Sequence, residues 1–123
     1  MRTSEPTGSE LQDFVEKVKQ RANEIESGES DDADIANALE KEIGSIYRRL
    51  RTRGRAAQQS LYSLLDDPDP NVRGAAATYV LDFEPDRALP VLEEVAAIPR
   101  GGFAGTRAEL TLDVWKSGKY KIT

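Results

Sequence analysis

The sequence predicts an all-α fold of about six helices, and three observations lead to that class. Apolar residues recur at the spacing of one helix face along most of the chain. Proline and glycine residues divide these periodic stretches at short intervals. No stretch alternates apolar and polar residues as a half-buried strand would. With 123 residues, we expect a single domain over residues 9–123, preceded by a disordered polar segment, residues 1–8.

The first predicted helix spans residues 9–27, because Ser9 suits an N-cap and Gly28 stops the periodic pattern. Two arrangements stay open for it: it packs on the rest of its own chain, or it is an added arm that swaps to a neighbour. Its apolar stripe consists of Leu11, Phe14, Val15, Val18, Ala22 and Ile25.

The second predicted helix begins among the acids at Asp31, Asp32 and Asp34 and runs to about Arg53, where Gly54 closes it. Its predicted apolar face is Ile35, Leu39, Ile43, Ile46, Tyr47 and Leu50. Basic side chains gather at its negative end, namely Arg48, Arg49, Arg51, Arg53 and Arg55. They indicate a site for phosphate or an acidic protein face. The alternatives are a solvated helix end that compensates the dipole, or pairing with the acids of residues 24–34 of the same chain or a second copy.

A helical hairpin is predicted over residues 61–83. A third helix, 56–66, buries three leucines and ends before Pro68, which disfavours helical geometry in the residue before it. Asp69 then suits an N-cap and Pro70 the first position of a fourth helix, 70–83. The leucines are Leu61, Leu64 and Leu65, and the inner face of the fourth helix is Val72, Ala75, Ala76, Tyr79, Val80 and Phe83.

Two details of this hairpin bear on function. The run from Gly74 to Ala77 allows two helix backbones to approach closely. Asp67, Asp69 and Asn71 alternate as in a calcium loop, but the loop glycine and the closing Glu are missing. We therefore expect a capped turn there and no metal.

The fifth helix is expected to start near Asp86, because Pro90 fits only the first turn of a helix. Its apolar residues are Ala88, Leu89, Leu92, Val95 and Ile98. A break at residues 99–102 separates it from a sixth helix, residues 103–116, which Gly118 ends. The sixth helix is expected to turn Ala108, Leu112 and Trp115 inward.

Composition excludes several classes of function. The chain contains no Cys and no His, so thiolate chemistry, disulfides and the commonest general base and metal ligand are missing. We therefore expect no cofactor and no enzyme, although Glu109 and Asp113 share a helix face and could act as a carboxylate pair. No apolar run is long enough for a signal peptide or a membrane span, and a cytoplasmic protein is expected.

The net charge of −5 is distributed unevenly. Residues 1–40 carry a net charge of −7, residues 41–60 a net of +5, and residues 61–123 a net of −3. An acidic segment beside a basic patch indicates self-association or a charged protein partner. Nucleic acid is not expected, because no aromatic residues for base stacking are interleaved with the arginines.

Helix pairs recur along the second half of the chain. Leu61 aligns with Leu89, 28 residues later, and Arg73 aligns with Arg107, 34 residues later. Such an interval is typical of a helical solenoid. The segment DDPDPNVRGAAATYVL resembles the inner turn and following helix of HEAT repeats. Together with IYRRL near its start and AELTLDVWKSG near its end, the stretch from Ile46 onward resembles a family of small bacterial HEAT-like proteins of unknown function.

The resemblance implies a short HEAT-like helical solenoid. Some small proteins of this general kind are immunity partners of secreted bacterial toxins, so the resemblance also suggests a protein that occludes a toxin. Arg73 and Arg107 recur in the repeat and are expected to bridge carboxylates or carbonyls of the neighbouring hairpin; the alternative is that they bind an anionic ligand. Residues with an expected structural role are Asp69, Pro70, Arg73, Arg107 and Trp115.

The sequence thus favours a non-enzymatic protein-binding module, and the first hypothesis is an acidic inhibitor of a basic toxin. The alternative is a self-associating scaffold, in which the acids of residues 24–34 meet the arginines of residues 48–55 of another copy. The candidate partner-binding residues are the acids Asp82, Glu84, Asp86, Glu93 and Glu94 and the arginines Arg48, Arg49, Arg51 and Arg53.

Overall fold

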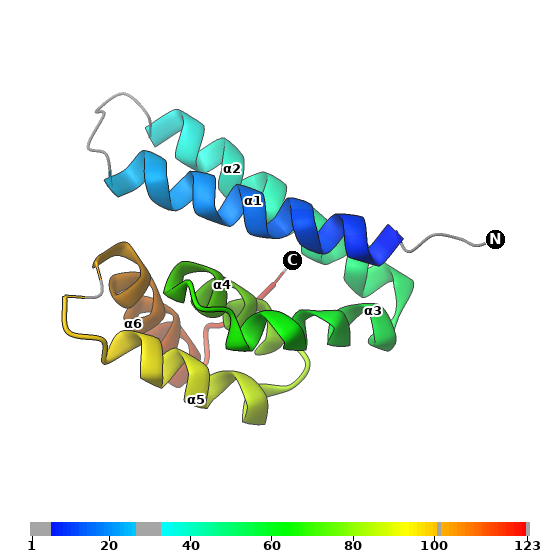
Figure 1. Cartoon of the computed structure of the whole chain (residues 1–123). Coiled ribbons are helices and arrows are strands. Elements are labelled where there is room, and N and C mark those ends of the chain that lie inside the picture. The colour runs from blue at the N-terminus through cyan, green and yellow to red at the C-terminus, as the bar shows by residue number, and fades with distance from the viewer. Residues whose placement is uncertain (1–5, 27–32, 101, 123) are drawn as a thin grey trace. The chain divides into compact units, whose positions relative to one another are not determined.

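The computed structural model describes residues 6–26, 33–100 and 102–122, and the described residues contain helices and no strand (Figure 1). The prediction of an all-α fold is confirmed. The helices are α1 (Pro6–Glu26), α2 (Ala33–Arg53), α3 (Arg55–Gln59), the 3-10 helix η2 (Ser60–Asp66), α4 (Pro70–Val80), α5 (Pro85–Ala96) and α6 (Gly102–Lys116).

The chain forms two compact units, Met1–Leu61 and Tyr62–Thr123, and the boundary between them falls within η2. Unit 1 contains α1, α2 and α3, and unit 2 contains α4, α5 and α6. A single domain over residues 9–123 stays a prediction.

In unit 1, α1 and α2 lie side by side and run in opposite directions (Figure 1). The ion pairs between them give the direction, because the residue number on α2 falls as the number on α1 rises. The pairs are Glu10 with Arg49 and Arg53, Lys17 with Glu42, and Arg21 with Glu40. The buried apolar residues beneath them are Phe14, Val18, Ala22, Ala36, Leu39, Ile43, Ile46, Tyr47 and Leu50.

Two residues of the predicted apolar faces are exposed. Ile35 is 45% exposed, because the buried stripe of α2 begins at Ala36 instead. Ile35 lies four residues and Ala36 three residues before Leu39, so either could share its buried face. Packing against α1 selects Ala36. Ile25 is 41% exposed, because it lies in the last turn of α1, beyond the last buried residue of that helix, Ala22.

Helix α1 begins at Pro6, three residues before the predicted cap at Ser9. Proline suits this position, because its ring pre-sets the helical φ angle and its missing N–H would have no partner in the first turn. Residues 6–8 are therefore helical, which corrects the expectation that residues 1–8 are disordered. The rest of that segment, residues 1–5, lies outside the described residues.

Helix α2 ends at Arg53, as predicted, and Gly54 follows it with a φ of 116° that favours glycine. The expected third helix, 56–66, is divided into α3 and the tighter η2. A buried hydrogen bond joins α3 to α2, because Gln58 Nε2 donates to Tyr47 Oη at 2.9 Å. The three leucines of η2 are buried, as predicted.

The turn before α4 has the predicted capped geometry. The side chain of Asp69 accepts a hydrogen bond from the backbone N–H of Asn71 at 2.9 Å, and Pro70 occupies the first helical turn. Asp67 Oδ1 accepts from the N–H of Asp69 at 2.9 Å. These acids therefore bind backbone groups of their own turn, as the capped-turn interpretation requires.

Helix α4 ends at Val80, three residues before the predicted end. Residues 81–83 form a turn, in which the N–H of Phe83 donates to the carbonyl of Val80 at 3.1 Å. Phe83 is consequently half-buried, and its ring stacks on Tyr62 with centroids 6.0 Å apart. Arg87 lies over the Tyr62 ring, with its guanidinium carbon 4.2 Å from the ring centroid.

In unit 2, helix α5 packs against both α4 and α6, and small residues set these approaches. A Cβ atom added at Gly74 of α4 would lie 3.7 Å from Val95 Cγ1 of α5. A Cβ atom added at Gly105 of α6 would lie 3.6 Å from the Val95 carbonyl oxygen. The close approach expected at Gly74 is therefore present, and Gly105 provides a second one that the sequence analysis missed.

Helix α5 begins at Pro85, so Pro90 lies in its second turn and the prediction that it lies in the first is wrong. Proline there deprives the carbonyl of Asp86 of its usual helical donor. Both residues are exposed, so water can hydrate that carbonyl. The helix therefore continues through the proline.

Helix α6 buries Ala108 and Leu112, as predicted, while Trp115 is only half-buried. The C-terminal tail explains the position of Trp115, because the ring of Tyr120 meets it edge-on with centroids 5.5 Å apart. Tyr120 also donates its hydroxyl proton to the carbonyl of Thr78 on α4. The tail thus packs onto unit 2.

Candidate functional site

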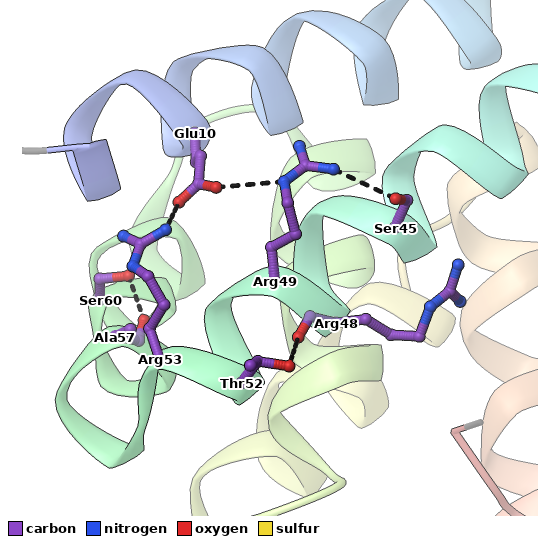
Figure 2. A network of polar contacts seen from close by, with 8 residues as sticks. All are labelled: Glu10, Ser45, Arg48, Arg49, Thr52, Arg53, Ala57 and Ser60. Carbon is purple, nitrogen blue, oxygen red and sulfur yellow. Dashed lines mark hydrogen bonds and ion pairs between the residues drawn. The ribbon is translucent and has the colours of Figure 1, made fainter.

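Two arginines of the predicted cluster bind one carboxylate of α1 (Figure 2). Arg49 Nε donates to Glu10 Oε2 at 3.2 Å, and Arg53 Nη1 donates to the other oxygen, Oε1. The Glu10 side chain is only 17% exposed, so this carboxylate is largely removed from water. Both arginines thus find a carboxylate at Glu10. Pairing with the acids of residues 24–34, three of which lie outside the described residues, stays a prediction.

The same arginines line a hollow of about 400 Å³ on α2, together with Arg48, Ser45 and Thr52. These five residues follow the spacing i, i+3, i+4, i+7 and i+8, which places them on one face of the helix. Ser45 Oγ accepts from Arg49 Nη1 at 3.1 Å and thereby orients that guanidinium. The hollow is therefore a basic surface with at least one fixed donor group.

Arg48 differs from its two neighbours. Its side chain is exposed and points away from Glu10 in Figure 2. Within the described residues, no side chain forms an ion pair with its guanidinium. Three guanidinium groups thus line the hollow, and Glu10 neutralises part of their charge.

Arg51, the fourth basic candidate, lies on another face of α2. It is half-buried, and its guanidinium carbon lies 5.7 Å from the ring centroid of Tyr47. It does not belong to the residues that line the hollow. The structure therefore brings together Arg48, Arg49 and Arg53 and leaves Arg51 apart.

A second hollow, of about 410 Å³, adjoins the first through Arg49 and is lined mainly by α1. Its lining includes three acids, Glu10, Asp13 and Glu16. The surface thus changes from basic to acidic across the Glu10–Arg49 ion pair.

The acidic candidates of unit 2 divide into three kinds. Asp86 and Glu93 are exposed and seven positions apart, so they lie on the same face of α5. Among the described residues, no cation pairs with either of them. Glu94 instead lies 3.5 Å from Arg73 Nε of α4. The remaining two, Asp82 and Glu84, are half-buried in the turn between α4 and α5.

Arg73 makes contacts of the kind expected for a structural role. Its Nη1 donates to the carbonyls of Asp67 at 2.9 Å and Pro68 at 3.3 Å, in the turn before α4. With Glu94, these contacts tie the turn to α5. Arg107 is half-buried on α6, and its carbonyl accepts from Thr111 Oγ1 at 2.9 Å.

Sequence reasoning missed Glu10 and Arg21. Arg21 is 4% exposed, and its Nη1 lies 3.5 Å from Glu40 Oε1 between α1 and α2. Both residues can be found once α1 and α2 are known to be antiparallel, because that register places Glu10 opposite Arg49 and Arg53. The same register places Lys17 Nζ 3.0 Å from Glu42 Oε1 of α2, while Asp13 Oδ1 of its own helix lies 3.4 Å away.

The ion pairs of Lys17 change its ionisation. The hydrogen bond that Lys17 donates to Glu42 raises the pKa of Lys17 above its usual 10.5, and Asp13 adds to this effect, while burial opposes it. Lys17 therefore remains charged over the whole neutral range and holds α1 to α2 there.

Three other features considered from the sequence are the Glu109–Asp113 carboxylate pair, metal ligands and a membrane span. Glu109 lines a hollow of about 350 Å³ at the start of α6, with Arg100 and Thr106, but Asp113 does not belong to its lining. In residues 6–26, 33–100 and 102–122, no three acidic, Cys or His side chains gather as a metal site. Across the same residues, no helix has both the length and the apolar character that crossing a bilayer requires.

Comparison of the chain with protein families, with curated proteins and with solved structures finds no match.

Proposed function

We propose that the chain is a non-enzymatic protein-binding module that neutralises a basic bacterial toxin by occluding it, as immunity proteins do. The observation that carries the proposal is the pair of exposed acids on α5, Asp86 and Glu93, which have no cationic partner among the described residues. Unpaired acids on one helix face attract a basic partner and speed its association.

The way unit 2 holds α5 supports this proposal. Val95 on the buried side of α5 lies opposite Gly74 and Gly105 of the two neighbouring helices, where an added Cβ atom would just touch it, and Arg73 pairs with the exposed Glu94. A helix held from both sides keeps its acids in place before a partner arrives. Binding to such a surface costs little ordering entropy.

A HEAT-like arrangement is part of the proposal. It is supported by the Asp69 cap, by the binding of Arg73 to the turn carbonyls and by the packing of α4 against both α5 and α6. In this arrangement η2 with α4 and α5 with α6 would be successive helix pairs. Short arrays of that kind present a rigid face to another macromolecule.

The experiment starts with affinity capture of the partner from the native lysate at low salt, and light scattering then gives the mass of the complex. The captured protein is tested for an activity or toxicity that an equimolar amount of this chain abolishes. We then compare Asp86→Lys/Glu93→Lys with a control, Glu26→Lys/Asp34→Lys, which makes the same charge change on exposed residues of unit 1.

We expect the α5 variant to weaken binding at least about ten-fold, and the control to weaken it far less, because charge reversal at the contact costs more than a change in net charge. Affinity should also fall as salt rises. Equal losses in the two variants, or binding that salt leaves unchanged, would overturn the proposal. A mass that grows with concentration in the absence of any partner would favour the self-associating scaffold instead.

A further inference from the structure

We infer that the hollow on α2 formed by Ser45, Arg48, Arg49, Thr52 and Arg53 is a second binding site, that it takes a carboxylate-bearing segment of a protein partner, and that Glu10 of α1 competes with this segment from within the chain. This site is opposite in charge to the acidic face of α5. The inference does not depend on the function proposed for that face.

The ligand class follows from what the arginines already bind. Arg49 and Arg53 each donate to a different oxygen of the Glu10 carboxylate (Figure 2). Guanidinium groups favour this arrangement, because their planar donors match the two oxygens of a carboxylate. The geometry needed to hold a carboxylate is thus present in the folded chain.

The hollow has capacity beyond Glu10. Arg48 lines it without an ion-pair partner among the described residues, and its exposed side chain can reach an incoming acid. The carbon stems of the arginines give the hollow an apolar floor beneath its charged groups. An extended acidic segment could therefore place one carboxylate on Arg48 and a second in the position of Glu10.

Protein carboxylates suit this surface better than nucleic acid does. The adjoining hollow presents Glu10, Asp13 and Glu16, which would repel a continuous phosphate backbone. Among the described residues, those that line the arginine hollow include no aromatic ring on which a base could stack. A short acidic segment can avoid the acidic side and use the basic side alone.

Glu10 sets how readily the site is filled. While Glu10 holds Arg49 and Arg53, only the fraction of molecules with this pair open can bind the segment fully. Partly exposed ion pairs of this kind have energies that correspond to a change in affinity of up to about five-fold. Removing the Glu10 charge should therefore tighten binding by about that factor.

The test uses a synthetic hexaglutamate peptide, measured by calorimetry at low salt against the full chain. We expect Glu10→Gln to bind the peptide about five-fold more tightly than the unaltered chain, for the reason just given. The matched control is Glu26→Gln, which removes one exposed acid from the far end of the same helix. It should raise the affinity by less than two-fold, because it changes only the net charge.

Further arms identify the site and the ligand. In the Glu10→Gln background, Arg48→Ala should lose most of the gain in affinity for hexaglutamate. Hexaglutamine, which carries no side-chain charge, should not bind. A short DNA duplex should bind less tightly than hexaglutamate to Glu10→Gln. In the unaltered chain, the Nε resonances of Arg48, Arg49 and Arg53 should shift as the peptide is added, which tests the site without any substitution.

Three results would overturn the inference. The first is an equal gain for Glu10→Gln and Glu26→Gln, which would reduce the effect to net charge. The second is tighter binding of the DNA duplex, which would make the hollow a phosphate-backbone site. The third is a peptide that shifts arginine resonances outside the hollow and leaves those three unchanged.

Discussion

The two units hold their helices together by different means. In unit 1, α1 and α2 meet across ion pairs spread along their length, from Glu10 with Arg49 to Arg21 with Glu40. In unit 2, α4 and α6 approach α5 through glycines, and a charged contact, Arg73 with Glu94, lies at the edge. Both units pack helix on helix over buried apolar residues, yet ion pairs border the contact in the first, and glycines allow the close approach in the second.

This difference has a functional counterpart. Ion pairs between helices can be exchanged for ion pairs with a partner, because each charged group keeps an equivalent interaction. Close helix packing cannot be exchanged in this way, since opening it exposes apolar surface and leaves voids. Unit 1 therefore suits a site that a partner competes for, and unit 2 suits a rigid face.

The largest expected effect is a cavity in unit 2. Leu92→Ala removes a fully buried side chain and should lower the free energy of unfolding by about 3 kcal/mol. The loss should be the same at low and high salt in urea unfolding. The matched control is Leu110→Ala, on a residue that is 57% exposed, which should change stability by less than about 0.5 kcal/mol. Similar losses in the two variants would contradict the assignment of the core.

The next effect tests the helix approach at Gly74. Gly74→Leu should lower the free energy of unfolding by about 2 kcal/mol, because the added side chain must displace Val95. Gly74→Ala serves as its control, since a Cβ atom 3.7 Å from Val95 Cγ1 makes an ordinary contact and alanine favours the helix. Thermal unfolding that ranks leucine equal to alanine would show that volume does not limit this contact.

A smaller effect distinguishes a carboxylate of unit 2 from those of unit 1. Asp69→Ala should cost about 1 kcal/mol, because the side chain caps α4 by binding the Asn71 N–H. The loss should persist in high salt, unlike that of an exposed ion pair. Asp66→Ala, at an exposed position in the preceding 3-10 helix, is the control and should be nearly neutral in the same denaturant titration. A salt-sensitive Asp69 effect would place this acid with the ion pairs.

The smallest effect is a dependence on pH in unit 1. Lys17→Met should cost about 0.5 kcal/mol at pH 8, the value typical of an exposed ion pair. Because the folded-state pKa of Lys17 is raised above 10.5, its contribution is complete below pH 10.5 and disappears as the pH rises through the higher folded value. The difference in unfolding free energy between the unaltered chain and Lys17→Met, measured from pH 8 upward, should shrink in that range. A difference that stays constant would exclude the ion pair as its cause.

Local signals in the sequence accounted for much of the fold. The Asp69 cap, Pro70 at the start of α4 and the end of α2 before Gly54 each depend on one residue and its immediate backbone, so their positions could be predicted. The buried leucines of η2 followed from their spacing. The division of residues 55–66 into α3 and η2 could not be predicted from the spacing, because a 3-10 helix buries leucines at that spacing nearly as well as an α-helix does.

The candidate site was only half predictable. The arginines on α2 were visible as a cluster, since their spacing is local. The carboxylate that they bind lies 39 residues before Arg49 and 43 before Arg53, and only the antiparallel pairing of α1 with α2 identifies it as Glu10. Spacing also could not separate Arg51 from its neighbours, because the contact with Tyr47 depends on how α2 is packed.

The sequence alone therefore determined the class of the fold, the caps and turns at Asp69 and Gly54, most of the buried stripes and the charges available on each helix, because these depend on neighbours a few residues away. Tertiary structure decided where each stripe ends, as at Ile25 and Ile35, which acid meets which arginine, and which charges remain unpaired. Those choices depend on groups far apart in the chain, whose interaction energies are defined only once the helices have packed.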